Sequence, residues 1–345
     1  MKYRLLGRTG MYVSELCLGT MTFGDQGFWK VMGGLGQEAV NVLVKQAFDA
    51  VVNFIDTANV YSLGMSETLT GSAIKSLGLP RDEIVVATKA YGPMSETKVN
   101  GRGQSRYHLM NELDASLKRL QLDHIDLYQL HGFDPVTPLE EVLSTLNDMV
   151  RSGKVRYIGL CNMAAWQIMK GLAISDKNNW ARFESVQAYY TVAGRDLERE
   201  VVPLIQNQQL GLMVWSPLAG GLLSGKFSVD GKSPEGARRA SFDFPVVDKA
   251  RAFKVVDAMR PIAERHQATV AQVALAWLLS RTQVSSVIVG AKTPEQLKDN
   301  LGASSLALTS EDLQTLEEVS KLPPEYPGWM LAMQGQYRVV PPARA

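Results

Sequence analysis

The sequence predicts a single parallel (β/α)8 TIM barrel with an N-terminal β-hairpin. Eight short apolar runs rich in β-branched residues alternate with segments whose apolar residues recur at helical spacing. A chain of 345 residues is within the size that one α/β barrel reaches. An open doubly wound sheet would carry a Gly-x-Gly-x-x-Gly turn after its first strand, and the sequence has none there. Together these observations favour a closed barrel.

The first predicted elements are two short strands, residues 2–5 and 11–14, on either side of the turn Gly7-Arg8-Thr9-Gly10. This arrangement is typical of a β-hairpin. The eight barrel strands are predicted at residues 16–19, 53–56, 84–88, 125–130, 155–160, 185–188, 212–215 and 286–289. Helical spacing predicts helices at residues 37–50, 66–77, 106–120, 138–152, 164–174, 197–208, 249–266, 270–281 and 294–302.

Two stretches depart from the repeat. Residues 220–248 are rich in Gly, Ser and Pro and separate the seventh strand from its helix. Loops of this length in a compact domain are usually functional or disordered. The tail 322–345 is also predicted to be a loop, and its aromatic residues suggest that it lies near the substrate pocket of one domain spanning 1–345. The alternative for both stretches is a mobile surface segment.

The composition excludes several classes of function. The net charge of +1 gives no electrostatic reason to expect nucleic acid or an acidic membrane as the main partner. The apolar runs are too short to span a bilayer, and the N-terminus lacks the apolar core of a signal peptide. Two cysteines suggest no disulfide framework, so we expect a cytoplasmic protein. No spacing of ligand residues suggests a metal site.

Four polar residues follow the predicted strands in a regular way. Asp56 ends the second strand and Tyr61 lies just beyond it, Lys89 ends the third strand, and His131 follows the fourth. The C-terminal ends of all strands in a parallel barrel point to one face, and that face carries the chemistry. We therefore expect these four side chains to meet around one substrate.

The four residue types are suited to reducing a carbonyl group. A tyrosine hydroxyl can protonate the nascent alkoxide if a neighbouring cation favours its ionised form, and Lys89 could be that cation. Asp56 could hold Lys89 and keep it charged, while His131 could orient the carbonyl oxygen. Each residue alone could instead be structural: a turn cap, a loop tyrosine, a solvated lysine or a core histidine. Their joint position at successive strand ends favours a catalytic site.

Eight segments of the sequence match a known family of proteins. They are Leu18-Gly19-Thr20-Met21, Asn53-Phe54-Ile55-Asp56-Thr57-Ala58, Tyr61-Ser62-Leu63-Gly64-Met65-Ser66-Glu67, Ala87-Thr88-Lys89, Leu130-His131, Gly153-Lys154-Val155-Arg156-Tyr157-Ile158-Gly159-Leu160, Trp215-Ser216-Pro217-Leu218 and Gly290-Ala291-Lys292. In these segments the sequence resembles the aldo-keto reductase superfamily of NADPH-dependent carbonyl reductases. The resemblance spans roughly residues 3–316 and is strongest to the bacterial long-loop branch, which also contains the potassium-channel β subunits.

The resemblance implies that Asp56, Tyr61, Lys89 and His131 are the catalytic tetrad, with Tyr61 as the acid. It also implies an NADPH (NADP+) site at the same face. Asn162 and Gln187 would hold the carboxamide of the nicotinamide, and Trp215 would stack on its ring. The full set of implied cofactor residues is Gly19, Thr20, Met21, Asp56, Cys161, Asn162, Gln187, Trp215, Ser216, Pro217, Leu218, Gly221, Leu223, Lys226, Gly290, Ala291, Lys292, Gln296 and Asn300.

Two segments carry the expected phosphate contacts. The long loop that begins at Ser216 would clasp the pyrophosphate, with glycines allowing close backbone approach. Residues 290–293 precede a helix that begins at Pro294, which is a favourable place for an anion. Lys292 at this point favours NADPH over NADH through the 2′-phosphate. Taken alone, Lys292 could be a solvated loop lysine.

The sequence departs from the family pattern at three positions. Cys161 replaces a usual serine, from which we expect a modest loss of binding, and Met163 replaces a common aromatic residue. Val51 replaces a usual glycine before Asn53. If the backbone at Val51 has a positive φ, a β-branched residue there is strained; otherwise the preceding helix ends differently.

The predicted substrate pocket is aromatic and uncharged. Its candidate residues are Phe23, Phe28, Trp29, Tyr91, Tyr326 and Trp329. These side chains favour a bulky or ring-bearing aldehyde, ketone or secondary alcohol over a phosphorylated sugar, although ordinary loop packing would also account for them.

The leading hypothesis is therefore a reversible NADPH-dependent reductase that acts on a small-molecule carbonyl. One alternative is an NADPH-binding regulatory module resembling the channel β subunits, in which turnover is slow. Another is a lyase that uses Lys89 as a nucleophile, which would require a neutral amine at this position. The sequence does not show the natural substrate, the stereochemistry or whether the chain forms a homo-oligomer.

Overall fold

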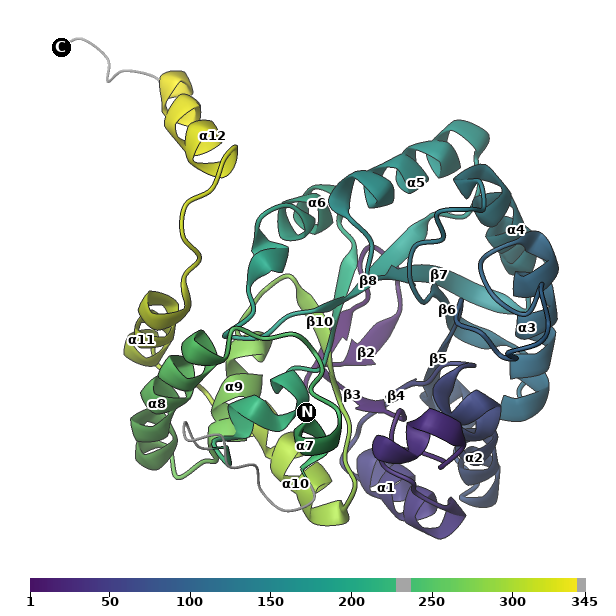
Figure 1. Cartoon of the computed structure of the whole chain (residues 1–345), viewed down its shortest axis with the longest axis horizontal. Coiled ribbons are helices and arrows are strands. Elements are labelled where there is room, and N and C mark those ends of the chain that lie inside the picture. Colours follow the sequence, from purple (N-terminus) through teal and green to yellow (C-terminus); the bar gives the residue numbers. More distant parts are fainter. Residues whose placement is uncertain (228–236, 340–345) are drawn as a thin grey trace.

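Eight parallel strands close into a barrel in the computed structural model, which describes residues 1–227 and 237–339. The strand order around the barrel is β10-β3-β4-β5-β6-β7-β8-β9, and helices surround it (Figure 1). The strands are β3 (Leu16–Gly19), β4 (Phe54–Asp56), β5 (Val85–Ala90), β6 (Ile125–Leu130), β7 (Val155–Cys161), β8 (Phe183–Tyr189), β9 (Gly211–Trp215) and β10 (Val284–Val289). The predicted (β/α)8 barrel is confirmed.

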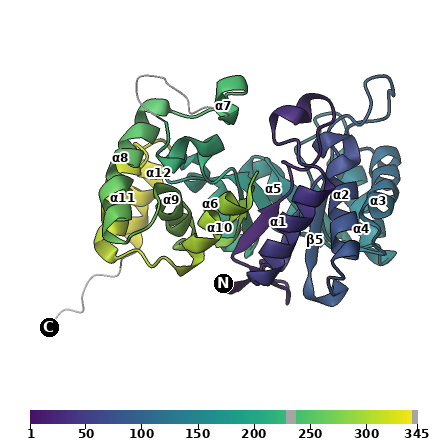
Figure 2. The same ribbon diagram turned by 90° about the horizontal axis from the view of Figure 1, so that it is seen from below.

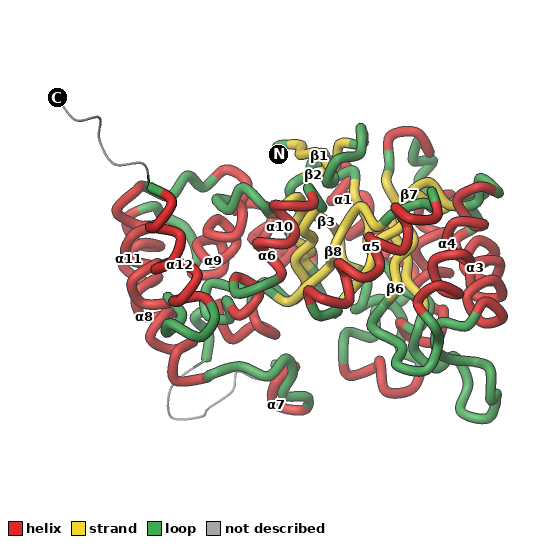
Figure 3. The backbone as a smooth tube through the Cα atoms, turned by 90° about the horizontal axis from the view of Figure 1, so that it is seen from above, coloured by secondary structure: helices red, strands yellow, loops and turns green. Residues whose placement is uncertain are grey.

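The predicted N-terminal hairpin is also confirmed. Strands β1 (Tyr3–Leu5) and β2 (Tyr12–Ser14) pair antiparallel. The turn between them needs a glycine at Gly7, because its φ is +61° and a Cβ would lie 2.4 Å from the carbonyl oxygen of Glu184. The hairpin therefore packs closely against the N-terminal end of the barrel, opposite α7 (Figure 3).

Helices alternate with the strands, and among those in the described residues nine lie at the predicted positions and three were not predicted. They are α1 (Gln37–Asp49), α2 (Met65–Ser76), α3 (Arg106–Leu120), α4 (Leu139–Arg151), α5 (Ala165–Asn178), α6 (Val201–Gln208), α7 (Arg238–Ser241), α8 (Lys249–Arg265), α9 (Val270–Leu279), α10 (Pro294–Gly302), α11 (Ser310–Ser320) and α12 (Gly328–Gly335). Three short 3-10 helices near the catalytic end also matter: η1 (Gly27–Val31), η2 (Tyr61–Gly64) and η5 (Ala219–Ser224). Figure 2 shows α7 at the end of the barrel opposite the N-terminus.

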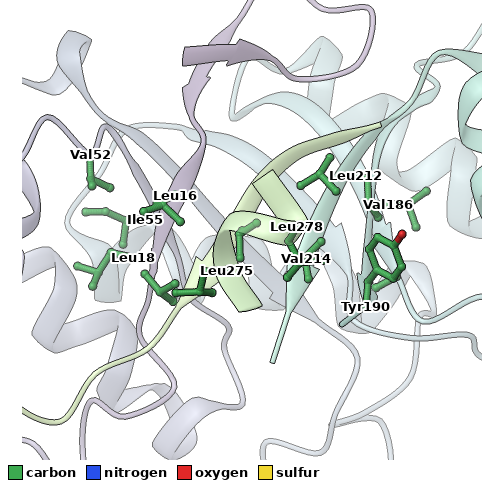
Figure 4. Close-up of a cluster of buried hydrophobic side chains, with 14 of the residues drawn as sticks. Leu16, Leu18, Val52, Ile55, Val186, Tyr190, Leu212, Val214, Leu275 and Leu278 are labelled. Carbon is green, nitrogen blue, oxygen red and sulfur yellow. The ribbon is translucent and has the colours of Figure 1, made fainter. Parts of the chain in front are cut away.

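Two apolar clusters hold the barrel together. The larger cluster lies between strands and helices, and Figure 4 shows part of it, including Leu212 and Val214 of β9 near Leu275 and Leu278 of α9. The smaller cluster includes Leu6 of the hairpin turn together with Phe54 and Leu127 from the strands. Apolar side chains from the hairpin and the strands thus form a core distinct from the polar strand ends.

The tail differs from the prediction. Residues 328–335 form a helix, α12, rather than a loop, and this helix stands apart from the barrel (Figure 1). Tyr326 and Trp329 contact each other, with ring centroids 6.1 Å apart, and both are exposed. The described part of the tail is thus not brought to the strand ends in this structure, and its expected place near the substrate pocket stays a prediction. Helix α11 was not predicted; it packs on α8, where Asp312 accepts a hydrogen bond from His266 Nε2 at 2.7 Å.

None of the helices in the described residues is long and apolar enough to cross a bilayer.

The backbone at Val51 adopts the strained conformation that the sequence raised as one possibility. Helix α1 ends at Asp49, and Val51 has a φ of +60° while its side chain is exposed. A β-branched residue is disfavoured there because its Cβ crowds the backbone. The exposed side chain makes few contacts that could offset this cost.

We expect Val51→Gly to raise the free energy of unfolding by about 1 kcal/mol, because glycine adopts a positive φ without strain. Urea denaturation of both proteins measures the difference. Val51→Ala is the control: it removes the branching but keeps a Cβ, so its gain should be smaller. A loss of stability in Val51→Gly would contradict the strain.

Candidate active site

The structure brings the four predicted catalytic residues together at the C-terminal ends of the strands. The Nζ atom of Lys89, on β5, lies 2.6 Å from Oδ2 of Asp56 at the end of β4. The same Nζ lies 3.3 Å from the hydroxyl oxygen of Tyr61. The ring of His131, just past β6, meets the Tyr61 ring edge-on, with centroids 5.6 Å apart. Strand-end placement alone thus identified a contiguous cluster.

An unusual loop presents Tyr61 to Lys89. Ser62, Leu63 and Gly64 have successive φ values of +48°, +51° and +92°. The loop is tied to β5 because Lys89 Nζ also donates to the carbonyl oxygen of Thr57 at 2.8 Å. Gly64 is required, since a Cβ there would lie 2.6 Å from Cδ of Arg119. The strained backbone turns sharply and keeps the Tyr61 hydroxyl beside the amine.

A buried ion pair supports this loop from behind. Arg119 donates through Nε to Oε2 of Glu67 at 2.6 Å, and the Glu67 side chain is fully buried at the start of α2. Arg119 also reaches Glu112 at 3.3 Å, and Asn59 of the loop donates to the same carboxylate at 2.9 Å. Buried charges are stable only when paired, so these contacts anchor the loop at a defined position.

Electrostatics favour a charged Lys89 beside a protonated Tyr61. Burial, the largest single effect, would lower the pKa of Lys89, but the Asp56 carboxylate, with further contributions from Tyr61 and Cys161, raises the pKa overall. Burial raises the pKa of Tyr61, while the charge of Lys89 acts to lower it. Burial, with a further contribution from the charge of Lys89, lowers the pKa of His131 to about 3. At neutral pH the cluster therefore holds an acid, a cation and a neutral imidazole.

The predicted carboxamide residues lie on the neighbouring strands. Gln187 on β8 donates through Nε2 to Oδ1 of Asp56 at 2.9 Å. Asn162 follows β7 with a φ of +53°, and its Oδ1 accepts a hydrogen bond from Nε1 of Trp215 at 2.9 Å. Cys161 is buried and its Sγ lies 3.9 Å from Oε1 of Gln129. These contacts join the expected nicotinamide residues to the catalytic cluster.

The remaining cofactor candidates lie at the ends of β3, β9 and β10. Gly19 ends β3 and Thr20 and Met21 follow it, and the Thr20 hydroxyl lies 2.8 Å from that of Ser66. The candidates Ser216, Pro217, Leu218, Gly221, Leu223 and Lys226 lie on or beside η5. The predicted loop 220–248 is described only at its two ends, because residues 228–236 lie outside the described residues.

The predicted anion site has the expected local structure. Gly290, Ala291 and Lys292 follow β10, and Thr293 caps α10 by accepting a hydrogen bond from the backbone N–H of Gln296. The Gln296 side chain accepts from the backbone N–H of Lys292 at 2.9 Å. Asn300 lies one turn further along α10 and is buried. Free N–H groups at a helix start attract anions, and Lys292 adds a positive charge.

A series of aromatic contacts begins at Tyr61. Trp29 of η1 lies 5.2 Å from the Tyr61 ring, measured between centroids, and contacts Phe28. Phe28 meets Phe242 at 5.0 Å, which links the segment after β3 to the segment after α7. Phe244 in turn stacks parallel to Trp215, with centroids 5.8 Å apart.

The other substrate candidates have different positions. Tyr91 is half-buried, and its ring carbons come within 3.4 Å of the position that a Cβ on Gly132, next to His131, would occupy. Phe23 is fully buried in the core and is not brought to the site, and Tyr326 and Trp329 lie with α12 away from it. Phe242 and Phe244 were missed because a Gly- and Pro-rich stretch gives no periodicity from which to place them.

Gln129 was also missed. It lies two residues before His131 on β6, so both side chains face the barrel interior, since strand residues alternate between faces. The two-residue spacing from His131 could have identified Gln129 from the sequence. Within the described residues no group of three or more His, Cys, Asp or Glu side chains could hold a metal ion.

Known proteins are similar to this chain over nearly its whole length. The model of the Aldo/keto reductase family matches residues 15–321. The uncharacterized oxidoreductase YrpG of Bacillus subtilis is 37% identical, over 92% of this chain and 96% of its own length. A putative aryl-alcohol dehydrogenase of Schizosaccharomyces pombe is 34% identical, over 92% and 95%. A putative voltage-gated potassium channel subunit beta of the same yeast is 36% identical, over 93% and 94%.

The lowered pKa of His131 predicts a pH-dependent stability. The unfolded chain binds a proton at His131 below about pH 6.5, whereas the folded protein does not until about pH 3. Stability is therefore lost as the pH falls through this window, by at most about 1.4 kcal/mol per pH unit. Urea unfolding of wild type and His131→Asn at pH 7.5, 6.5 and 5.5 should show that the variant loses less of its free energy of unfolding as the pH falls. If the two proteins differed in this free energy by the same amount at every pH, burial of a neutral imidazole would be contradicted.

Proposed function

Since this chain belongs to the aldo/keto reductase family, we propose that it reduces an aldehyde or ketone to an alcohol with NADPH. The observation that carries the proposal is the fully buried Lys89, whose Nζ contacts both the Asp56 carboxylate and the Tyr61 hydroxyl. Buried lysines are rare, and this one is placed where it can stabilise a developing phenolate.

When bound, NADPH would supply a hydride for the carbonyl carbon. Tyr61 gives its hydroxyl proton to the carbonyl oxygen, so that the product is a neutral alcohol and Tyr61 is left as a phenolate. Lys89 stabilises this phenolate, and Asp56 keeps Lys89 charged. Neutral His131, whose ring contacts that of Tyr61, can donate a hydrogen bond to the carbonyl oxygen and orient it. The reverse sequence oxidises an alcohol.

The residues that would hold the cofactor fit its chemistry. Asn162, Gln187 and Trp215 offer two amides and one flat ring beside the Tyr61 cluster. At the end of β10, the start of α10 together with Lys292 offers the positive end of a helix dipole and a cation to a phosphate. A 2′-phosphate distinguishes NADPH from NADH, and we therefore assign NADPH rather than NADH to this chain.

The substrate we propose is a bulky or ring-bearing carbonyl compound. Trp29, Phe28, Phe242 and Phe244 form a series of aromatic contacts between Tyr61 and Trp215. Flat rings stack favourably on such side chains, whereas a charged sugar phosphate gains nothing from them. The name of the aryl-alcohol dehydrogenase relative refers to a ring-bearing substrate as well.

A second candidate is an NADPH-binding regulatory module. The similarity to a potassium channel subunit beta favours it. In that case the cofactor would bind tightly and turnover would be negligible across a broad panel of carbonyl compounds. A lyase that uses Lys89 as a nucleophile fits less well, because the Asp56 carboxylate raises the pKa of Lys89 and keeps the amine protonated.

We expect Tyr61→Phe to lower kcat by about a hundredfold or more, since a positioned general acid typically contributes this much. NADPH oxidation is followed at 340 nm for wild type and variant, over aromatic aldehydes, cyclic ketones and sugars. NADPH affinity, measured by fluorescence, should be retained in the variant. Aromatic and cyclic substrates should rank first for wild type. Full activity of Tyr61→Phe would remove Tyr61 as the acid, and inactivity of both proteins despite bound NADPH would favour the regulatory module.

We expect Lys292→Ala to weaken NADPH binding by about tenfold or more, because a charge-assisted contact to the 2′-phosphate is lost. NADH binding should change little. Lys298→Ala is the matched control, since Lys298 is an exposed lysine on the same helix. Equal losses for NADPH and NADH in Lys292→Ala would contradict the 2′-phosphate contact.

A further inference from the structure

Gln129 is a fully buried glutamine among the catalytic side chains, and neither the tetrad nor the expected cofactor set includes it. It lies on β6 between Leu127 and His131, which share its interior face. Interior positions of such barrels are usually filled by branched apolar residues. A buried amide is costly unless both of its ends are hydrogen-bonded. Its contacts therefore indicate what it does.

Both ends of the Gln129 amide are used. Nε2 donates to Oδ1 of Asp56 at 3.1 Å. Oε1 accepts a hydrogen bond from Nε2 of Gln187 at 3.2 Å and lies 3.9 Å from the thiol of Cys161. Because Gln187 Nε2 also donates to Oδ1 of Asp56 at 2.9 Å, the three side chains form a closed ring of hydrogen bonds.

The barrel is shaped to admit this side chain. Gly159 on β7 faces Gln129, and a Cβ at this glycine would lie 3.3 Å from Cγ of Gln129 and 2.4 Å from Oγ of Ser185. A larger residue at position 159 would thus push against the glutamine and its neighbour. The space and the hydrogen-bond partners are both provided, as in other well-ordered buried polar networks.

The ring of hydrogen bonds determines which way the Gln187 amide faces. The NH2 group of Gln187 has two hydrogens, and it donates one to Asp56 and one to Gln129. The reversed amide would set the Gln187 oxygen against two other oxygens, which repel it. Only Oε1 of Gln187 is then left for a ligand, and within residues 1–227 and 237–339 no hydrogen bond occupies it.

We propose that Gln129 is a positioning residue that fixes the Gln187 amide, so that Gln187 presents its carbonyl oxygen to the carboxamide NH2 of the nicotinamide. This inference rests on the proposed use of NADPH. It also joins the two halves of the reaction. Asp56 contacts Lys89 through Oδ2 and the two glutamines through Oδ1. The same carboxylate therefore connects the glutamine that would orient the cofactor to the lysine beside the proton donor Tyr61.

The test compares two cofactors that differ in one hydrogen-bond donor. NADP+ carries the carboxamide NH2, whereas its 3-acetylpyridine analogue has a methyl group in its place. Dissociation constants for both are measured by tryptophan fluorescence, without catalysis. We expect wild type to prefer NADP+ by about fivefold to tenfold, the usual value of one hydrogen bond. In Gln129→Met, which keeps the length but loses the amide, the preference should fall, because Asp56 alone is left to orient the Gln187 amide.

Further variants separate positioning from simple stability. Leu127→Met alters an apolar position on the same strand and face, and its preference should equal that of wild type. Gln129→Asn, which is too short to reach Gln187, should lower the preference as Gln129→Met does. Gln129→Glu can still accept from Gln187 but repels Asp56, so it should retain the preference while kcat falls.

Two outcomes overturn the inference. One is an unchanged preference in both Gln129→Met and Gln129→Asn, and the other is a wild type that binds both cofactors equally. Failure of the proposed function is distinguishable from these, because a protein that does not use NADPH would bind neither NADP+ nor its analogue.

Discussion

The ion pair between Lys89 and Asp56 is the interaction on which the rest of the site depends. Both side chains are buried, and two charges removed from water are stable only when they face each other with their remaining hydrogen-bond positions satisfied. The structure meets this condition completely: Thr57 and Tyr61 take the other contacts of the amine, and two glutamines take the second carboxylate oxygen. The arrangement costs stability, which the apolar cores between strands and helices and at the hairpin end offset. Polar function and apolar support thus occupy different parts of one barrel.

The surrounding elements can be understood as supports for that pair. Ser62 and Leu63, the two left-handed non-glycine residues after Tyr61, are strained, and such strain persists only where neighbours determine the backbone. Here Arg119, Glu67 and Glu112 provide that constraint from α2 and α3. On the opposite side, the hydrogen bond between Trp215 and Asn162 fixes the ring that is expected to face the nicotinamide. Strands therefore hold the charged groups of Asp56 and Lys89, and helices hold the loop that places Tyr61 beside them.

Much of this could be predicted from the sequence, for identifiable reasons. The barrel and the meeting of the four predicted catalytic residues follow from strand periodicity, because the C-terminal ends of all strands in a parallel barrel lie at the same face. The strain at Val51 could be raised as a possibility because a β-branched residue stands where glycine is usual. Gln129 was missed, although its parity with His131 was visible, because a hydrogen-bond ring depends on three strands at once. Phe242, Phe244 and α12 were misplaced or overlooked since their positions depend on tertiary contacts that no local pattern encodes.

The aromatic contact between Phe28 and Phe242 has a consequence for how such a protein can diversify. These rings belong to segments more than two hundred residues apart in the sequence, and neither segment contributes a hydrogen bond to Asp56 or Lys89. Asp56 and Lys89 are built into strands, and Tyr61 is held against them by its own loop, whereas the rings proposed to meet the substrate are carried on other connecting segments. Mutations in either segment can therefore alter the range of compounds accepted while the acid and its supporting charges are inherited unchanged. A duplicated gene could acquire a new substrate without first losing its chemistry.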